Sequence, residues 1–212
     1  MRRAITYKIH PQYPQPYLIG KVAEAIRRGA VVLYPTDTVY AIGCHPGDKD
    51  SIERLRALKP QSQNLALTLL SPSLSDMTRY TYLEDDAFKL MKALTPGPFT
   101  FILKATKMVP KLVQNPKRKT AGVRIPSHPI CQALLAELGE PLVTTSARMP
   151  DGTEPQSEWE LFEALAPLVD VIVDDELPMN TVPSTVLDLS EAQPVILREG
   201  AGLEKLAPFM QD

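Results

Sequence analysis

Strand-length apolar runs alternate with amphipathic helical segments along most of this chain. The apolar run 30–34 has the length of a buried strand, and the preceding segment 16–28 has apolar residues at helical spacing. Such alternation is typical of α/β folds, in which helices pack on a sheet. Several strand-like runs lie close together in the second half, which favours some antiparallel pairing. We therefore predict an α/β fold with a mixed sheet, in one domain over residues 1–212.

The expected helices each carry apolar residues on one face, and they span 16–28, 48–58, 84–94, 127–138 and 158–165. Ser127 is the expected N-cap of its helix, and Gly139 is the expected residue after the end of that helix. The first expected strand is placed at an edge of the sheet. The expected strands are short, mainly apolar runs: 4–9, 30–34, 65–70, 99–104, 120–125, 141–145, 169–173, 184–189 and 194–197.

Composition argues against several classes of protein. Hydrophobic residues make up 44% and charged residues 23% of the chain, which is typical of globular proteins. Residues 1–18 contain no long apolar run, and no stretch approaches the roughly 20 apolar residues that cross a bilayer. Cys44 and Cys131 are far apart and the three histidines are scattered, so neither a disulfide framework nor a protein metal site is expected. We expect a cytoplasmic protein with no membrane partner.

Charge is unevenly distributed, although the net charge is only −2. The segment 104–124 has seven Lys and Arg residues and no Asp or Glu, whereas no Lys or Arg lies between Arg148 and Arg198. Two interpretations are equally open. The basic segment could be a solvated surface, or it could face the phosphates of a nucleotide or an RNA.

Hydroxylic side chains follow the predicted strand 30–34, where an α/β sheet usually presents its site. Thr36 and Thr38 could bond a polar substrate, and Tyr40 could form a wall of its pocket. On spacing alone, a turn in which Asp37 and Thr38 cap their own backbone is the favoured interpretation.

Arg124 stands in an apolar strand just before a predicted helix. A buried arginine needs a partner anion, and its planar fork suits a carboxylate as well as a phosphate. An internal salt bridge and a bound phosphate are therefore both compatible with the sequence. Three hydroxyl-bearing residues followed by Arg148 form a second candidate phosphate-facing group at the end of the strand that begins at Pro141. They are Thr144, Thr145 and Ser146. The sequence has no P-loop and no G-x-G-x-x-G fingerprint.

Six motifs occur in a fixed order, and together they resemble the YrdC-type threonylcarbamoyl-AMP synthases over about residues 15–202. Segments 9–11, 88–92 and 117–120 look most like the YciO branch of that family. The motifs are Thr-Asp-Thr-Val-Tyr at 36–40, Pro-Gly-Pro-Phe-Thr at 96–100, Val-Arg-Ile-Pro-Ser-His-Pro at 123–129, Thr-Ser-Ala at 145–147, Pro-Ser-Thr-Val-Leu-Asp at 183–188 and Leu-Arg-Glu-Gly-Ala at 197–201.

The resemblance implies a twisted sheet of the YrdC/RibB type, with helices packed around it, that encloses a large, concave, positively charged cavity. It implies nucleotidyl transfer, in which L-threonine, bicarbonate and ATP form L-threonylcarbamoyladenylate for tRNA modification and pyrophosphate is released. Mg²⁺ would accompany ATP. Family members also resemble proteins that bind double-stranded RNA, so double-stranded RNA or tRNA is a further expected partner.

The resemblance also assigns residues to the site. The catalytic group would be Lys59, Arg124 and Ser146, which would hold the phosphates and the carboxylate. The nucleotide side would add Thr144, Arg148 and Arg198, and the threonine and bicarbonate side would comprise Thr36, Thr38, Tyr40, Ser184 and Thr185.

Three positions depart from the family pattern. Gln61 replaces the Arg of Lys-x-Arg, Arg148 replaces the Asn of Ser-x-Asn, and Glu199 replaces the Pro of Arg-Pro-Gly. Because a neutral Gln cannot replace a bidentate Arg on a phosphate, synthase activity is expected to be weak unless Arg148 compensates. The alternatives are a non-catalytic protein of the same fold that binds RNA, and one that binds another nucleotide-like metabolite.

Overall fold

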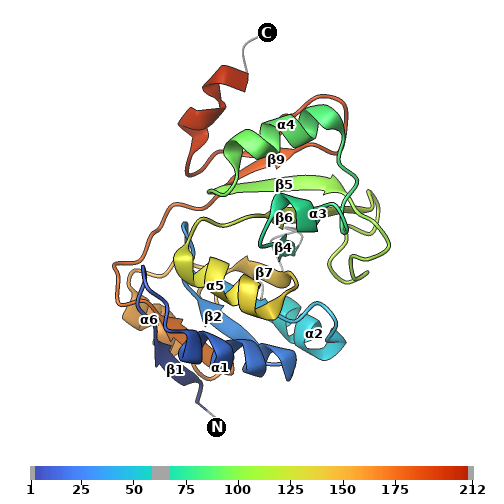
Figure 1. Cartoon of the computed structure of the whole chain (residues 1–212). Helices are drawn as coiled ribbons and strands as arrows, with labels where there is room; N and C mark the ends of the chain where they lie inside the picture. The colour runs from blue at the N-terminus through green and yellow to red at the C-terminus, as the bar shows by residue number, and fades with distance from the viewer. Residues whose placement is uncertain (1–2, 59–66, 210–212) are drawn as a thin grey trace.

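The computed structural model describes residues 3–58 and 67–209, and its centre is a ten-stranded mixed sheet (Figure 1). The strand order is β1-β8-β2-β3-β7-β4-β6-β5-β9-β10, with β1 at one edge as predicted. Pairs β1–β8, β2–β8, β4–β6 and β5–β9 are parallel, and the other five are antiparallel. The strands are β1 (Ile5–Lys8), β2 (Val32–Tyr34), β3 (Ala41–Cys44), β4 (Thr68–Leu70), β5 (Phe99–Lys104), β6 (Thr120–Arg124), β7 (Leu142–Ser146), β8 (Val171–Asp174), β9 (Thr185–Asp188) and β10 (Val195–Arg198).

The helices lie where the apolar spacing predicts them, with two short additions, α3 and η1. One boundary expectation is wrong: α5 begins at Pro129, and its N-cap is His128 rather than Ser127. Proline at the first helical position keeps the preceding residue extended, so the cap falls on His128, whose ring accepts a bond from the Ile130 amide. The helices are α1 (Pro16–Arg27), α2 (Lys49–Ala57), α3 (Leu74–Met77), α4 (Asp85–Leu94), α5 (Pro129–Leu138), α6 (Glu158–Leu165) and the 3₁₀ helix η1 (Leu203–Phe209).

In the middle of the sheet, the strand register separates a face of core side chains from a face that carries mainly small and hydroxyl-bearing residues. One row of laterally paired residues is buried core: Cys44, Val143, Leu69, Val123, Phe101 and Leu187. Adjacent residues in a strand point to opposite faces. The neighbouring row therefore points the other way, and it is Gly43, Thr144, Thr68, Gly122 and Ile102.

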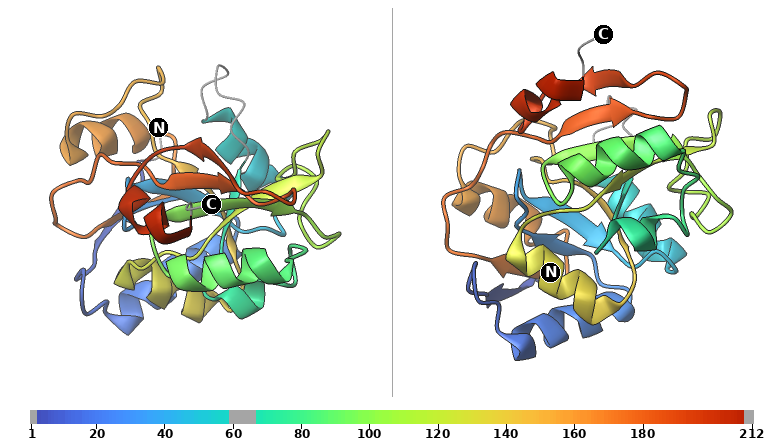
Figure 2. Two further views of the ribbon diagram at one scale, coloured as in Figure 1. Left: turned by 90° about the horizontal axis from the view of Figure 1, so that it is seen from above. Right: turned by 45° about the horizontal axis from the view of Figure 1, so that its top comes forward.

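Helices pack against both faces of the sheet. The larger core cluster joins the core row to buried residues of α2, α4 and α6. On the opposite face, α1 and α5 pack against the smaller cluster, which includes Val32, Leu70 and Val171. Because a sheet twists by roughly 20–25° per strand, one face points in opposite directions at its two ends. This explains why α4 lies on the other side of the sheet from α2 and α6 when the molecule is seen from above (Figure 2). On the face opposite the core row, Thr68, Thr144 and Ile102 form the floor of a cavity.

None of the helices in the described ranges combines the length and hydropathy that a bilayer span needs.

Candidate functional site

The cavity is lined mainly by hydroxyl and guanidinium groups. Its cations are Arg124, Arg148 and Arg198, and among the described lining residues no carboxylate balances them. The apolar lining includes Val39, and Leu58 at the end of α2. Such a lining favours an anionic ligand with several hydrogen-bond acceptors. The hydroxyl groups come from Thr36, Thr68, Thr100, Thr144, Thr145, Ser146 and Ser184.

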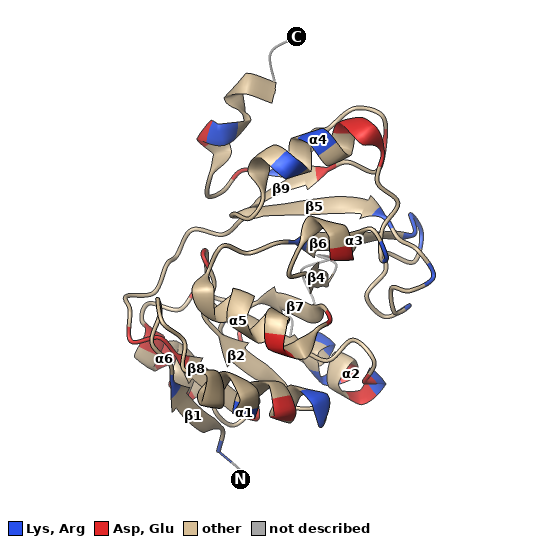
Figure 3. Cartoon of the chain, viewed as in Figure 1, with Lys and Arg blue, Asp and Glu red and all other residues tan. Residues whose placement is uncertain are grey.

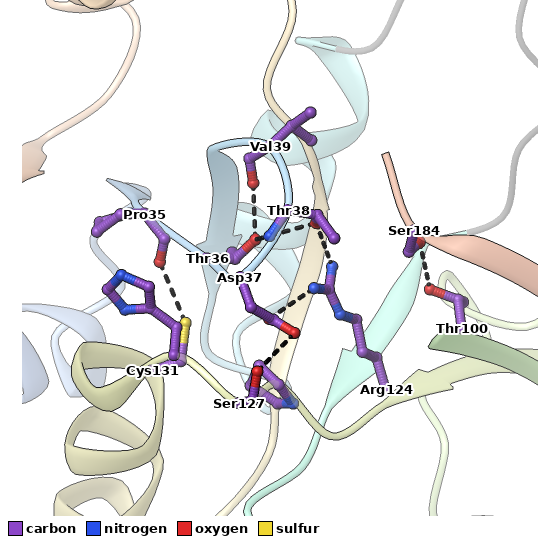
Figure 4. Close-up of polar contacts among 12 residues, drawn as sticks. Pro35, Thr36, Asp37, Thr38, Val39, Thr100, Arg124, Ser127, Cys131 and Ser184 are labelled. Atoms are coloured by element: carbon purple, nitrogen blue, oxygen red, sulfur yellow. Dashed lines mark hydrogen bonds and ion pairs between the residues drawn. The ribbon is translucent and has the colours of Figure 1, made fainter. Parts of the chain in front are cut away.

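Arg124 lies at the end of β6 and is nine-tenths buried. Its Nη2 donates to Asp37 Oδ1 at 2.6 Å and its Nη1 donates to Thr38 Oγ1 at 2.8 Å, as Figure 4 shows. Its Nε is buried without a hydrogen-bond partner in the part of the chain that the structure describes. Arg124 therefore pairs with an internal acid, as one of the two interpretations expected, and its side chain also lines the cavity. A bound phosphate at Arg124 stays a prediction.

The loop after β2 positions that pair. Thr36 Oγ1 accepts a bond from the Thr38 amide at 3.0 Å and donates to the Val39 carbonyl at 2.8 Å. The turn therefore caps itself, although Thr36 does the capping instead of Asp37 and Thr38. Asp37 Oδ2 accepts a bond from Ser127 at 3.1 Å, which ties the loop to the start of α5. Thr36 lines the cavity, whereas Thr38 acts through Arg124.

Tyr40 lies behind this loop and lines a second, smaller cavity. Its hydroxyl donates to Asp175 Oδ1 at 2.9 Å, and Asp175 Oδ2 lies 3.3 Å from His128 Nε2. Burial and the charge of Asp175 raise the pKa of Tyr40, so this hydroxyl stays protonated. Burial opposes ionisation of Asp175, but hydrogen bonds from His128 and Tyr40 outweigh it and lower the pKa of that carboxyl. The sequence did not single out Asp175, which follows β8 by one residue.

Arg198 is held on the other side of the cavity by Ser184. The guanidinium donates to the Ser184 carbonyl at 2.8 and 3.0 Å, and Ser184 Oγ lies 2.9 Å from Thr100 Oγ1 (Figure 4). Burial lowers the pKa of Arg198, and the charges of Arg148 and Arg124 lower it further. The cations therefore repel one another across the cavity, and an anion between them would relieve that repulsion.

The remaining predicted residues differ in whether their hydroxyl groups are exposed in the cavity and free of internal hydrogen bonds. Thr144 lines the cavity, but its hydroxyl already donates to the Ile42 carbonyl and accepts from Tyr34. Thr185 is fully buried and bonds the Ala201 carbonyl, so it supports the wall from behind. Ser146 is an exposed lining residue at the end of β7.

Lys59 and Gln61 lie outside the described residues. Two hydroxyl-bearing lining residues, Thr68 and Thr100, were not assigned to the site from the sequence. Strand alternation is the signal that could have found them. Thr68 and Thr100 point away from the face that carries Leu69 and Phe101, so they lie on the face that lines the cavity.

Comparisons with known proteins agree with this architecture. The Sua5/YciO/YrdC family model, described as "Telomere recombination", matches residues 24–200. The uncharacterized protein YciO of Escherichia coli is 43% identical over 205 residues, which are 96% of this chain and 98% of YciO. The threonylcarbamoyl-AMP synthase of Vibrio vulnificus is 32% identical over 185 residues, which are 86% of this chain and 98% of the synthase.

Two solved structures share the fold. The crystal structure of E. coli YciO has a TM-score of 0.88 at 42% identity, over 94% of this chain and 97% of that one. P. abyssi Sua5 complexed with L-threonine has a TM-score of 0.87 at 27% identity, over 98% of this chain and 61% of that one. The predicted fold is confirmed, and this chain belongs to the Sua5/YciO/YrdC family, with higher identity to E. coli YciO than to the V. vulnificus synthase.

Proposed function

We propose that this chain binds ATP in the cavity and forms L-threonylcarbamoyladenylate from L-threonine, bicarbonate and ATP. The observation that carries the proposal is the meeting of three arginines in a lining whose described residues include no carboxylate. The name of the V. vulnificus relative and the L-threonine complex of P. abyssi Sua5 support this choice of substrates.

The reaction sets a clear electrostatic task. Threonine and bicarbonate condense to a carbamate with loss of water, and a carbamate oxygen then attacks the α-phosphorus of ATP. The new P–O bond forms as the bond to pyrophosphate breaks, and the leaving group takes the electron pair. Because both reactants are anions, fixed cations must offset their repulsion and the charge that develops on the phosphate. Holding the two reactants in line supplies much of the remaining acceleration.

The lining residues divide these tasks in our proposal. Arg124, Arg198 and Arg148 bind phosphate oxygens, together with Lys59 and Ser146, and Thr36 faces the threonine side. Thr38, Tyr40 and Thr185 act through the residues that they hold. The hydroxyl oxygens of the lining would hold the Mg²⁺ that accompanies ATP, and the ion would offset part of the charge on the phosphates.

The proposal predicts pyrophosphate release that requires ATP, L-threonine and bicarbonate together. Release would be measured with purified protein, and threonylcarbamoyl-AMP would be identified by mass spectrometry. Omitting each substrate in turn provides the controls, and each omission is expected to reduce release to background. No product and no ATP binding at millimolar concentration would overturn the proposal.

RNA binding is a second candidate, favoured by the connection between β5 and β6. Lys104, Lys107, Lys111, Lys117 and Lys119 are all exposed on or beside it (Figure 3). Arg118 differs from them because it pairs with Asp188 at 2.7 Å, so its charge is partly neutralised. The exposed lysines could release counterions from a phosphate backbone.

Replacing Lys107, Lys117 and Lys119 by Gln together is expected to weaken binding to double-stranded RNA and to flatten its salt dependence. The slope of log K against log salt should fall by roughly 3 units, because each of the three lost phosphate contacts removes nearly one. Replacing Lys8, Lys21 and Lys49 by Gln is the matched control. Equal effects of the two triple variants would rule out this segment as the contact.

A further inference from the structure

The residue that departs from the Ser-x-Asn pattern, Arg148, is paired within its own loop. Its side chain lines the cavity and is 22% exposed, and its Nη1 contacts the Glu154 carboxylate. A tight turn brings Glu154 back onto Arg148: the Met149 amide donates to the Thr153 carbonyl, and Thr153 donates to Asp151. The ion pair is therefore set by local chain geometry.

Glu154 stands at the partition between two cavities. It lines the smaller cavity, whereas Arg148 lines the larger one, and Val39 belongs to both linings. Glu154 thus contacts Arg148 of the larger cavity, although Glu154 itself is not part of the lining of that cavity. Its charge also raises the pKa of Arg198, against the stronger lowering effects of burial, Arg148 and Arg124. Glu154 therefore offsets part of the repulsion among the cavity cations.

We infer that Glu154 is an internal counter-anion that occupies Arg148 in the empty cavity and sets the affinity for anionic ligands. This inference rests on the anion binding of the proposed function. A phosphate that binds Arg148 must first displace Glu154 from it. The free energy of binding is therefore smaller by the free energy needed to break the Arg148–Glu154 pair.

The burial of the two partners makes this exchange feasible. Glu154 is 58% exposed, so water can solvate its carboxylate once it leaves Arg148. Exposed ion pairs stabilise proteins only weakly. A phosphate between Arg148, Arg124 and Arg198 would instead meet several cations in a more buried place, where charge–charge attraction is stronger. Replacement of Glu154 by the phosphate is therefore favourable. The phosphate nevertheless binds less tightly than it would to an Arg148 that had no carboxylate partner.

The test is a double-mutant cycle on pyrophosphate binding, measured by calorimetry with the full chain. Glu154→Gln is expected to tighten pyrophosphate binding about fivefold. Arg148→Gln is expected to weaken it about tenfold. The double variant should match Arg148→Gln, since without Arg148 the charge at position 154 has no cavity arginine to occupy. Asp151→Asn is the control for charge alone: it removes one negative charge from the same loop, and its carboxylate contacts Thr153 rather than an arginine.

The outcomes separate this inference from the proposed function. Unchanged affinity in Glu154→Gln, or the same gain in Asp151→Asn or in the Arg148→Gln background, would overturn the role of Glu154. ATP would be titrated in parallel. A wild-type protein that binds pyrophosphate but not ATP would contradict the proposed function and still test Glu154, whereas one that binds neither would overturn both.

Discussion

Replacing Arg124 by Ala is expected to weaken ATP binding about 100-fold and to lower the free energy of unfolding by about 3 kcal/mol. The first effect follows because the guanidinium lines the cavity, and each of its Nη groups makes only one of the two hydrogen bonds that it can donate within the described residues. The second follows because the substitution leaves the Asp37 carboxylate, which is 12% exposed, without its charged partner. Calorimetric ATP titration and thermal unfolding measure the two effects separately.

Asp37→Asn is the matched control for Arg124→Ala. It breaks the same ion pair from the other side, so it should also destabilise the fold, but it leaves the cation in the cavity. We expect its ATP affinity to stay within about threefold of wild type. If Arg124→Ala binds ATP as the wild-type protein does, Arg124 has a structural role only and the proposed site is wrong.

Replacing Phe101 by Ala is expected to lower the free energy of unfolding by about 3–5 kcal/mol. Phe101 is fully buried in the centre of β5, and it stacks on Phe99 with ring centroids 6.3 Å apart. Removing the ring leaves a void in the core row between Val123 and Leu187 that rigid strands cannot close. Urea denaturation followed by circular dichroism would measure the loss.

The neighbouring residue Thr100 provides the control for Phe101→Ala, because it points to the opposite face of β5. Thr100→Ala removes one hydrogen bond to Ser184, so it should cost about 1 kcal/mol of stability. It should instead disturb ligand binding, since Ser184 positions Arg198. A larger loss of stability in Thr100→Ala than in Phe101→Ala would contradict the assignment of the two faces.

Much of the fold was predictable because local patterns determine it. The apolar spacing of 16–28 and the apolar run 30–34 correspond to α1 and β2 within a few residues. The strand β3 was not predicted. Its four buried residues, Ala41–Cys44, directly follow the predicted turn and include a glycine, so they do not form a distinct apolar run of strand length. A strand this short is recognised only through its partners, β2 and β7.

The sequence was sufficient to predict the charged residues of the candidate site, but not which residues they contact. The position of Arg124 in an apolar strand correctly indicated a buried cation that needs an anion. That Asp37 would be the internal partner, or that Tyr40 would turn away to Asp175, depends on strand register across 87 and 135 residues of sequence. No local pattern encodes such register. The Arg148–Glu154 pair is nearer in sequence, yet it depends on a turn whose direction the residue types alone do not specify.

The strand order has a consequence for how the protein forms during synthesis. The N-terminal strand β1 pairs only with β8, so Ile5 meets Val171, and β5 meets β9 through Phe101 and Leu187. Pairings between such distant segments make folding slow. A chain still emerging from the ribosome must hold β1 unpaired until most of its length is made. It can bind no ligand between its arginines until Arg198, near the C-terminus, has joined the sheet.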